Sequence, residues 1–124
     1  MQHQGQINAA RNSDGTYSYD ETFRYVKEEV SSADLAIANF EVTLGGQPYK
    51  GYPCFSAPDE YLQATIDAGF DVLLTANNHC LDSRQKGLER TIDMMLLWLN
   101  LSVIIIHLLR LEGCRRPRHI VRWQ

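Results

Sequence analysis

Two short apolar runs mark the strands that the hydrophobic pattern predicts in the first three quarters of the chain. The first fills residues 35–38 inside the segment 34–41, and the second fills residues 70–75. Consecutive apolar residues of this length are typical of parallel strands that are buried on both faces of a sheet. We therefore predict two buried parallel strands, each followed by polar residues.

Helical spacing of apolar residues precedes the first predicted strand. Phe23, Val26 and Val30 recur at intervals of three and four after Asp20, which can cap the helix. The polar residues between them would face solvent. This pattern predicts one helix that ends near residues 31–32.

Further helices are predicted between and after the strands. Pro58 fits the first turn of a second helix and Gly69 fits its C-terminal cap, while a third helix runs from Gln85 to at least Met94. Residues 43–57 combine Gly, Pro and aromatic residues, which predicts an ordered loop. The alternation of helices and strands indicates an α/β domain with a parallel sheet.

Composition limits the classes of protein to which the chain can belong. Its 124 residues, 44% of them hydrophobic, suit one small globular domain and exclude a fibre, collagen or wholesale disorder. Residues 1–93 carry 7 Lys and Arg against 14 Asp and Glu, whereas residues 94–124 carry 5 against 1. We therefore divide the chain into a partial domain (1–93) and an atypical apolar and basic tail (94–124), either out of frame or a basic interaction tail.

The cysteines and the apolar segments indicate whether the chain carries disulfides, a signal peptide or a membrane-spanning helix. Cys54, Cys80 and Cys114 are widely spaced and odd in number, so we expect free thiols. Residues 1–15 hold no apolar stretch that would serve as a signal peptide. Residues 94–111 are barely long enough to span a bilayer and contain three polar interruptions. A buried or improperly folded segment is the preferred interpretation, and a spanning helix is the alternative.

The candidate chemistry begins with Asn39 and Glu41 at the end of the first predicted strand. Side chains two residues apart on a strand point the same way, and amide and carboxylate oxygens suit Mn²⁺ or Mg²⁺. The structural alternative is that Asn39 satisfies a turn and Glu41 is solvated.

A second polar cluster follows the second predicted strand and contains Asn77, Asn78, His79 and Asp82. Histidine is both a metal ligand and a proton donor near neutral pH. The structural alternative is a tight turn with a surface His79 and with Asp82 capping the next helix. Because sites in parallel sheets form beyond the carboxyl ends of the strands, the two clusters together predict a metal-centred site in one crevice.

These segments resemble a known family. Residues 33–41, residues 58–79 and the pair Leu81-Asp82 are similar to the bacterial capsule synthesis proteins of the CapA or PgsA type, linked to poly-γ-glutamate capsules. The resemblance covers residues 1–93. It implies an α/β sandwich like that of calcineurin-like metallophosphoesterases, with parallel strands flanked by helices, of which this chain is a fragment.

The resemblance also implies roles for individual residues. Glu41 matches a metal-bridging acid, Asn78 an amide ligand, and His79 the catalytic histidine that contacts the leaving oxygen or phosphate. Two Mn²⁺ or Mg²⁺ ions would orient a water and polarise the substrate. The residues that match positions shaping the site are Asn39, Asn77 and Asp82.

The chain also departs from the family pattern. The family opens with a strand ending in Gly-Asp-x-Met and ends its site with later histidine motifs, whereas the tail here offers only His107 and His119 in other contexts. We therefore expect a chain that is incomplete at both ends, is poorly soluble or dependent on a partner, and has weak or absent metal binding and little or no catalysis of its own.

The resemblance implies a role in capsule or poly-γ-glutamate synthesis at the cell envelope, with the capsule-synthesis machinery as partner. Membrane association would come through the tail or through an N-terminal anchor, and no nucleic acid is expected. Two alternatives remain: a non-catalytic interaction module, and a small membrane-associated protein that uses residues 94–111.

Overall fold

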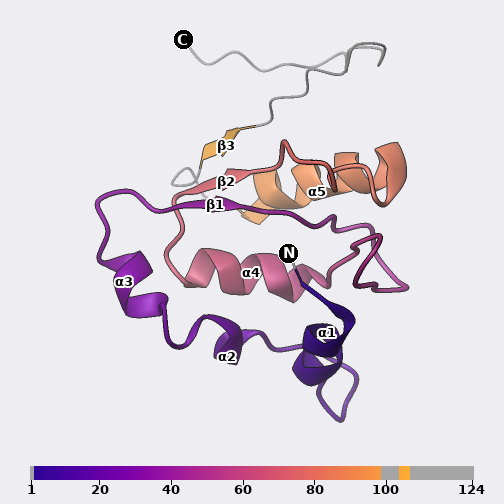
Figure 1. Ribbon diagram of the computed structural model, residues 1–124, viewed down its shortest axis with the longest axis horizontal. Coiled ribbons are helices and arrows are strands. Elements are labelled where there is room, and N and C mark those ends of the chain that lie inside the picture. The colour runs from indigo at the N-terminus through magenta and orange to yellow at the C-terminus, as the bar shows by residue number, and fades with distance from the viewer. Residues whose placement is uncertain (1, 99–103, 107–124) are drawn as a thin grey trace.

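Three parallel strands lie at the centre of the computed structural model, which describes residues 2–98 and 104–106 (Figure 1). They are β1 (Ile37–Asn39), β2 (Val72–Leu74) and β3 (Ile104–Ile106), in the order β1-β2-β3. Ile37 pairs with Val72, and Val72 pairs with Ile104. The predicted α/β class with a parallel sheet is confirmed.

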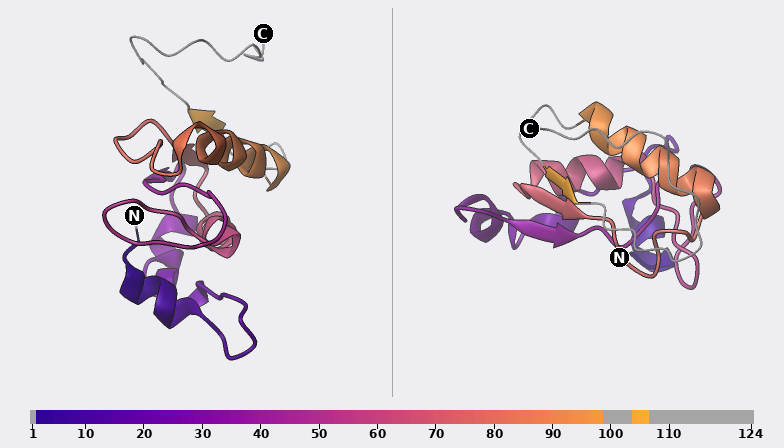
Figure 2. Two further views of the ribbon diagram at one scale, coloured as in Figure 1. Left: turned by 90° about the vertical axis from the view of Figure 1, so that its right-hand side faces the viewer. Right: turned by 90° about the horizontal axis from the view of Figure 1, so that it is seen from above.

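Helices carry the connections between successive strands. The helices are α1 (Gln4–Ala10), α2 (Asp20–Phe23), α3 (Lys27–Ser31), α4 (Asp59–Asp67) and α5 (Arg84–Trp98). α4 connects β1 to β2, and α5 follows β2. Figure 2 shows α4 and α5 on the same side of the sheet, as expected when strands in sequential order are joined by crossovers of one hand.

The predicted second and third helices are confirmed with small shifts at their ends. Pro58 stands immediately before α4 as its N-cap residue, one position earlier than predicted. Gly69 takes the left-handed φ of 99° that ends the helix, which a residue without Cβ adopts at little cost. α5 begins at Arg84 and extends to Trp98.

The core lies between the strands and these two helices. Leu73 of β2, Leu62 of α4 and Met95 of α5 are fully buried in one cluster. Phe55 and Leu44, from the predicted loop, are fully buried in it as well. The expectation of an ordered loop at residues 43–57 is therefore confirmed, because its apolar side chains supply part of the core.

The prediction that the first strand is buried on both faces is wrong. Ile37 is 54% exposed and Leu35 is 59% exposed, whereas Ala36 and Phe40 are buried. Both α4 and α5 cover the same face of the sheet, so side chains that alternate to the other face of β1 meet solvent. β1 is also an edge strand in the described part of the sheet. A continuous apolar run did not distinguish one covered face from two.

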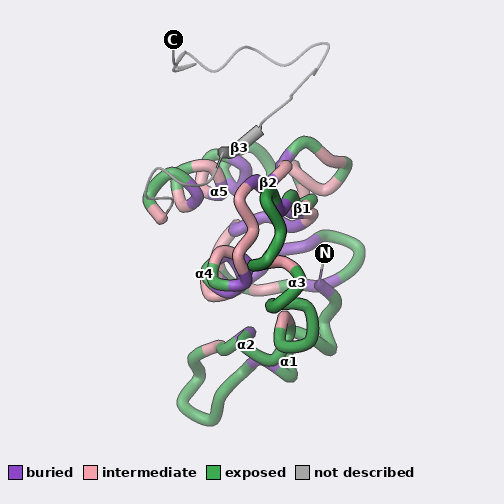
Figure 3. The backbone as a smooth tube through the Cα atoms, turned by 90° about the vertical axis from the view of Figure 1, so that its left-hand side faces the viewer, coloured by how far each residue is buried: buried purple, intermediate pink, exposed green. Residues whose placement is uncertain are grey.

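The predicted single helix after Asp20 is also wrong, because the chain forms α2 and α3 with a turn at residues 24–26 between them. Phe23 packs against Tyr61 and Phe70. Val26 is 46% exposed, so the apolar stripe is anchored at one end only. Short helices depend on tertiary packing, and most residues of α3 are exposed (Figure 3).

α1 was not predicted from the sequence. Only Ile7 and Ala10 are buried along it, so its apolar pattern is too sparse to detect. The His3 backbone N–H donates to Gln6 Oε1 at 2.8 Å, which satisfies one amide at the start of the helix.

Part of the tail lies within the described residues. Met94 to Trp98 continue α5, and Ile104–Ile106 form β3. Among the described residues, no helix is both long and apolar enough to cross a membrane. The remainder of residues 94–124, with Cys114, His107 and His119, lies outside the described residues, and the origin of the tail stays a prediction. Cys54 and Cys80 are free thiols, as expected.

Candidate functional site

The polar ends of β1 and β2 meet beyond the sheet. Phe40 N donates to Leu74 O at 2.9 Å, which keeps the two chains together past Asn39. Asn77 Nδ2 donates to Asn39 Oδ1 at 3.1 Å and to Phe40 O at 3.3 Å. Asn77 thus joins the two polar clusters that the sequence placed at the ends of neighbouring strands.

Glu41 is held by the residue two positions before it. Asn39 Nδ2 donates to Glu41 Oε2 at 3.0 Å, so both amide atoms of Asn39 are engaged, one with Asn77 and one with Glu41. The Glu41 side chain is 21% exposed. The alternative of a freely solvated Glu41 is wrong, because this carboxylate is half-buried and oriented by an amide.

His79 is fixed at its backbone and at one ring nitrogen. Its N–H donates to Asn77 Oδ1 at 3.0 Å, and its Nδ1 lies 2.8 Å from Asp82 Oδ2. The edge of the ring also meets Phe55, with centroids 4.6 Å apart. The His79 side chain is 15% exposed, so the alternative of a surface histidine is wrong.

The imidazole orientation places its second nitrogen opposite Glu41. A carboxylate accepts hydrogen bonds, so His79 Nδ1 carries the proton that it donates to Asp82. In the neutral ring, Nε2 is then the nitrogen with the lone pair. Nε2 lies 3.9 Å from Glu41 Oε1. A lone pair near a carboxylate oxygen is repulsive, and a metal cation bound between the two atoms would relieve that repulsion.

Asp82 has a second role in the loop. Its Oδ2 accepts the Phe55 backbone N–H at 2.7 Å as well as contacting His79. The alternative in which Asp82 caps the next helix is wrong, because its carboxylate turns toward Phe55 and His79 and α5 begins only at Arg84.

A comparison with protein families places the chain among known proteins. The sequence profile of the bacterial capsule synthesis protein family, PGA_cap, matches residues 1–96, more than half of the chain. The chain belongs to the bacterial capsule synthesis protein family. The resemblance seen in its sequence motifs is therefore confirmed.

A curated relative of the chain is the capsule biosynthesis protein CapA of Bacillus anthracis. The two are 35% identical over 82 residues, which cover 61% of this chain and 20% of CapA. The chain thus spans about a fifth of the length of that relative. No solved structure matches the chain.

The remaining predicted metal ligand, Asn78, lies apart from this network. Asn78 is exposed, and its side chain has no hydrogen-bond partner among the described residues. The structure therefore brings Asn39, Glu41, Asn77, His79 and Asp82 together and leaves Asn78 at the surface beside them. The catalytic role of His79, the metal-binding roles of Glu41 and Asn78, and the site-shaping roles of the other three residues stay predictions.

The separation of Glu41 and His79 is short enough for both to reach one ion. Metal–ligand distances of about 2.0–2.2 Å allow two ligand atoms to lie up to about 4.4 Å apart, and the observed separation is 3.9 Å. Asp82 behind His79 supplies the carboxylate that commonly orients a ligating imidazole. Within residues 2–98 and 104–106, no group of three His, Cys, Asp or Glu is placed to hold a metal. The described residues thus fit part of a coordination shell.

A set of hydrogen bonds that join Arg90 and Thr91 of α5 to Leu44 and Asp59, called the latch, was not predicted from the sequence. Arg90 donates to both carboxylate oxygens of Asp59 at 2.7 Å and to Leu44 O at 2.6 Å. Thr91 Oγ1 accepts the Leu44 N–H at 2.8 Å. The side-chain hydrogen bonds with Asp59 raise the pKa of Arg90, so its charge persists. This latch anchors the start of the loop whose Phe55 packs on His79.

Proposed function

We propose that this chain takes part in capsule polymer synthesis at the cell envelope by contributing the Glu41–His79 pair to a metal-dependent phosphoester site. Membership of the capsule synthesis family supports the process. The observation that carries the chemistry is the imidazole held at Nδ1 by Asp82, with Nε2 3.9 Å from Glu41 Oε1.

Glu41 and His79 would hold a divalent ion such as Mn²⁺ or Mg²⁺, with the exposed Asn78 amide available as a further oxygen ligand. When bound, the ion would polarise a phosphoryl oxygen and lower the pKa of a water molecule. Asp82 keeps the proton on His79 Nδ1, so that Nε2 can bind the ion or receive and return a proton at a departing oxygen. The capsule polymer in this proposal is poly-γ-glutamate.

Glu41 and His79 do not complete a coordination shell, even with Asn78 as a third ligand, so we expect little turnover from this chain by itself. The test is hydrolysis of bis(p-nitrophenyl) phosphate by the purified chain with Mn²⁺. Any activity should disappear in His79→Ala and persist in Gln63→Ala, an exposed position on α4. Activity that survives His79→Ala would rule out this site as its source.

The cellular test addresses capsule synthesis directly. His79→Ala in the encoding gene should lower the amount of cell-bound capsule polymer severalfold, whereas Gln63→Ala should not. Unchanged capsule in the His79 variant would contradict the proposed contribution of this residue.

A second candidate is a non-catalytic interaction module, which the exposed edge strand favours. Leu35 and Ile37 expose apolar side chains beside an unpaired edge of the described sheet. If this surface is what matters, Ile37→Lys should lower capsule polymer while His79→Ala leaves it unchanged. The opposite outcome favours the phosphoester site.

A further inference from the structure

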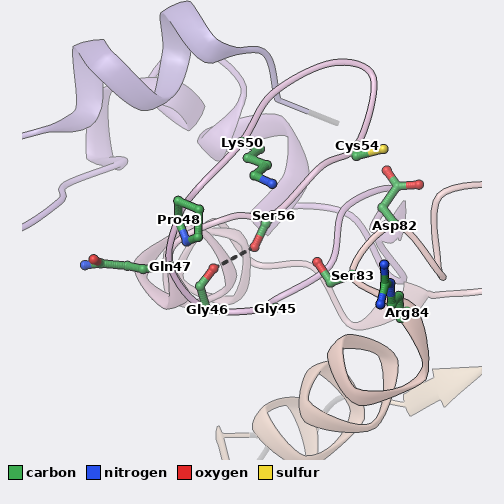
Figure 4. Close-up of a pocket in the computed structure, with 10 residues that line it drawn as sticks. All are labelled: Gly45, Gly46, Gln47, Pro48, Lys50, Cys54, Ser56, Asp82, Ser83 and Arg84. Atoms are coloured by element: carbon green, nitrogen blue, oxygen red, sulfur yellow. Dashed lines mark hydrogen bonds between the residues drawn. The ribbon is translucent and has the colours of Figure 1, made fainter.

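A hollow of about 190 Å³ lies behind the candidate site, between the loop and the start of α5 (Figure 4). A single buried water needs only about 10–15 Å³ of such volume, so the hollow accommodates a much larger group. Its lining includes Gly46, Lys50, Ser56, Asp82, Ser83 and Arg84. Asp82 belongs to this wall and also orients His79.

Two cationic side chains line the hollow without a counter-ion. Neither Lys50 nor Arg84 makes an ion pair with any residue that the structure describes. Figure 4 shows them on different sides of the group of lining residues. The one carboxylate in the wall, Asp82, is engaged through Oδ2 with Phe55 N and His79 Nδ1. The lining thus carries two positive charges against one negative charge.

The serine hydroxyl groups of the wall already donate hydrogen bonds to other protein atoms. Ser56 Oγ donates to Gly46 O at 2.9 Å. Thr43 Oγ1 donates to Phe55 O at 2.7 Å, so in its 2.6 Å contact with Ser83 Oγ the proton must come from Ser83. The donors that remain at side chains in this wall are mainly the two cations, because Gln47 points away from the group in Figure 4. A ligand rich in acceptor oxygens fits such a wall better than a neutral polyol.

The backbone around the hollow is fixed. Lys50 and Ser56 exchange two backbone hydrogen bonds of 2.9 Å, which hold the Lys50 Cα in place. Arg84 starts the 15-residue helix α5, whose first turn contains no acidic residue. The positive end of the helix dipole therefore adds to the two side-chain charges.

We propose that this hollow binds a phosphate group, held by Lys50 and Arg84. A phosphate offers up to two negative charges and at least three acceptor oxygens, enough for two cations that approach from different sides. A carboxylate has one charge and two oxygens in a plane, so it satisfies this pair less well. The site does not require a metal at Glu41 and His79, and a phosphate bound there lies beside the residue that orients His79.

The test is titration of the full chain with inorganic phosphate at constant ionic strength, followed by the backbone amide resonances of Gly45, Gly46 and Arg84. Saturable shifts are expected with phosphate, and acetate should bind at least about tenfold more weakly. Lys50→Gln combined with Arg84→Asn should weaken phosphate binding at least about tenfold, the effect of losing charge-assisted hydrogen bonds. Asn tolerates the φ of 59° that Arg84 adopts.

Matched variants separate the pocket from general charge effects. Lys86→Gln removes the same charge from an exposed position on α5 outside the lining and should change affinity less than about twofold. Lys50→Arg should retain binding, and Lys50→Gln alone, at an exposed side chain, provides the test if the double variant does not fold. Phosphate affinity that is unchanged in the Lys50 and Arg84 variants would overturn the site. Equal affinity for acetate and phosphate would overturn the ligand class.

Discussion

The backbone N–H of Phe55 donates to Oδ2 of Asp82 at 2.7 Å, although the two residues are 27 positions apart. The same oxygen lies 2.8 Å from His79 Nδ1, and the ring of Phe55 packs against the His79 ring. The carboxylate that orients the histidine therefore also anchors the loop that covers it. A substitution of Asp82 is therefore expected to disturb both the packing of the loop at Phe55 and the orientation of His79.

Asp82→Ala should lower the free energy of unfolding by roughly 1–3 kcal/mol, because it leaves the N–H of the fully buried Phe55 without an acceptor. Urea denaturation followed by tryptophan fluorescence measures the change. Asp34→Ala, at an exposed position whose side chain has no hydrogen-bond partner among the described residues, should remain within about 0.5 kcal/mol of the parent chain. Equal effects of the two substitutions would show that the Asp82 contacts do not hold the loop.

Gly45→Ala should destabilise the chain by roughly 1–3 kcal/mol, because a Cβ there would overlap the side chain of Ser83. Gly5→Ala is the control, since a Cβ at Gly5 meets nothing within 4 Å and Ala favours the helix α1. We expect Gly5→Ala to be neutral or to stabilise by up to about 1 kcal/mol. Thermal unfolding of both variants decides the matter, and a Gly45 variant as stable as the Gly5 variant would contradict the packing described here.

Arg90→Lys should cost about 1 kcal/mol of unfolding free energy, although the charge is kept. A lysine cannot make the paired bonds to both oxygens of Asp59 while also reaching Leu44 O. The expected loss is small because the Arg90 side chain is 39% exposed, so solvent screens its ion pair. Arg24→Lys, in the exposed pair with Glu21, should change stability by less than about 0.5 kcal/mol. If the chemical denaturation curve of Arg90→Lys superimposes on that of Arg24→Lys, the hydrogen bonds of Arg90 do not stabilise the fold.

The elements with strong local signals could be predicted from the sequence. Gly69 after a short amphipathic helix, and the apolar run that follows it, identified α4 and β2 because their signals come from neighbouring residues. The meeting of the polar ends of β1 and β2 also followed from parallel pairing, which brings Asn39 and Asn77 into contact.

The parts that were missed depend on contacts distant in sequence. The exposed face of β1 depends on where the helices lie, and Ile37 looks the same in sequence whether its face is covered or open. The break after Phe23 depends on whether Val26 finds a packing partner. The hydrogen bonds from Arg90 to Asp59 and from Phe55 N to Asp82 join segments 31 and 27 residues apart, and no periodic pattern encodes such pairs.

The Glu41–His79 pair is tested most directly by Mn²⁺ titration of the full chain, followed by paramagnetic broadening of the histidine ring resonances. This method detects weak binding, which is what two donors provide. The His79 signals should broaden at lower Mn²⁺ than those of His3, and Glu41→Gln should raise the Mn²⁺ required severalfold, whereas Glu89→Gln on the exposed face of α5 should not. If the His79 signals broaden no earlier than those of His3, or if Glu41→Gln leaves them unchanged, the two side chains do not share a cation.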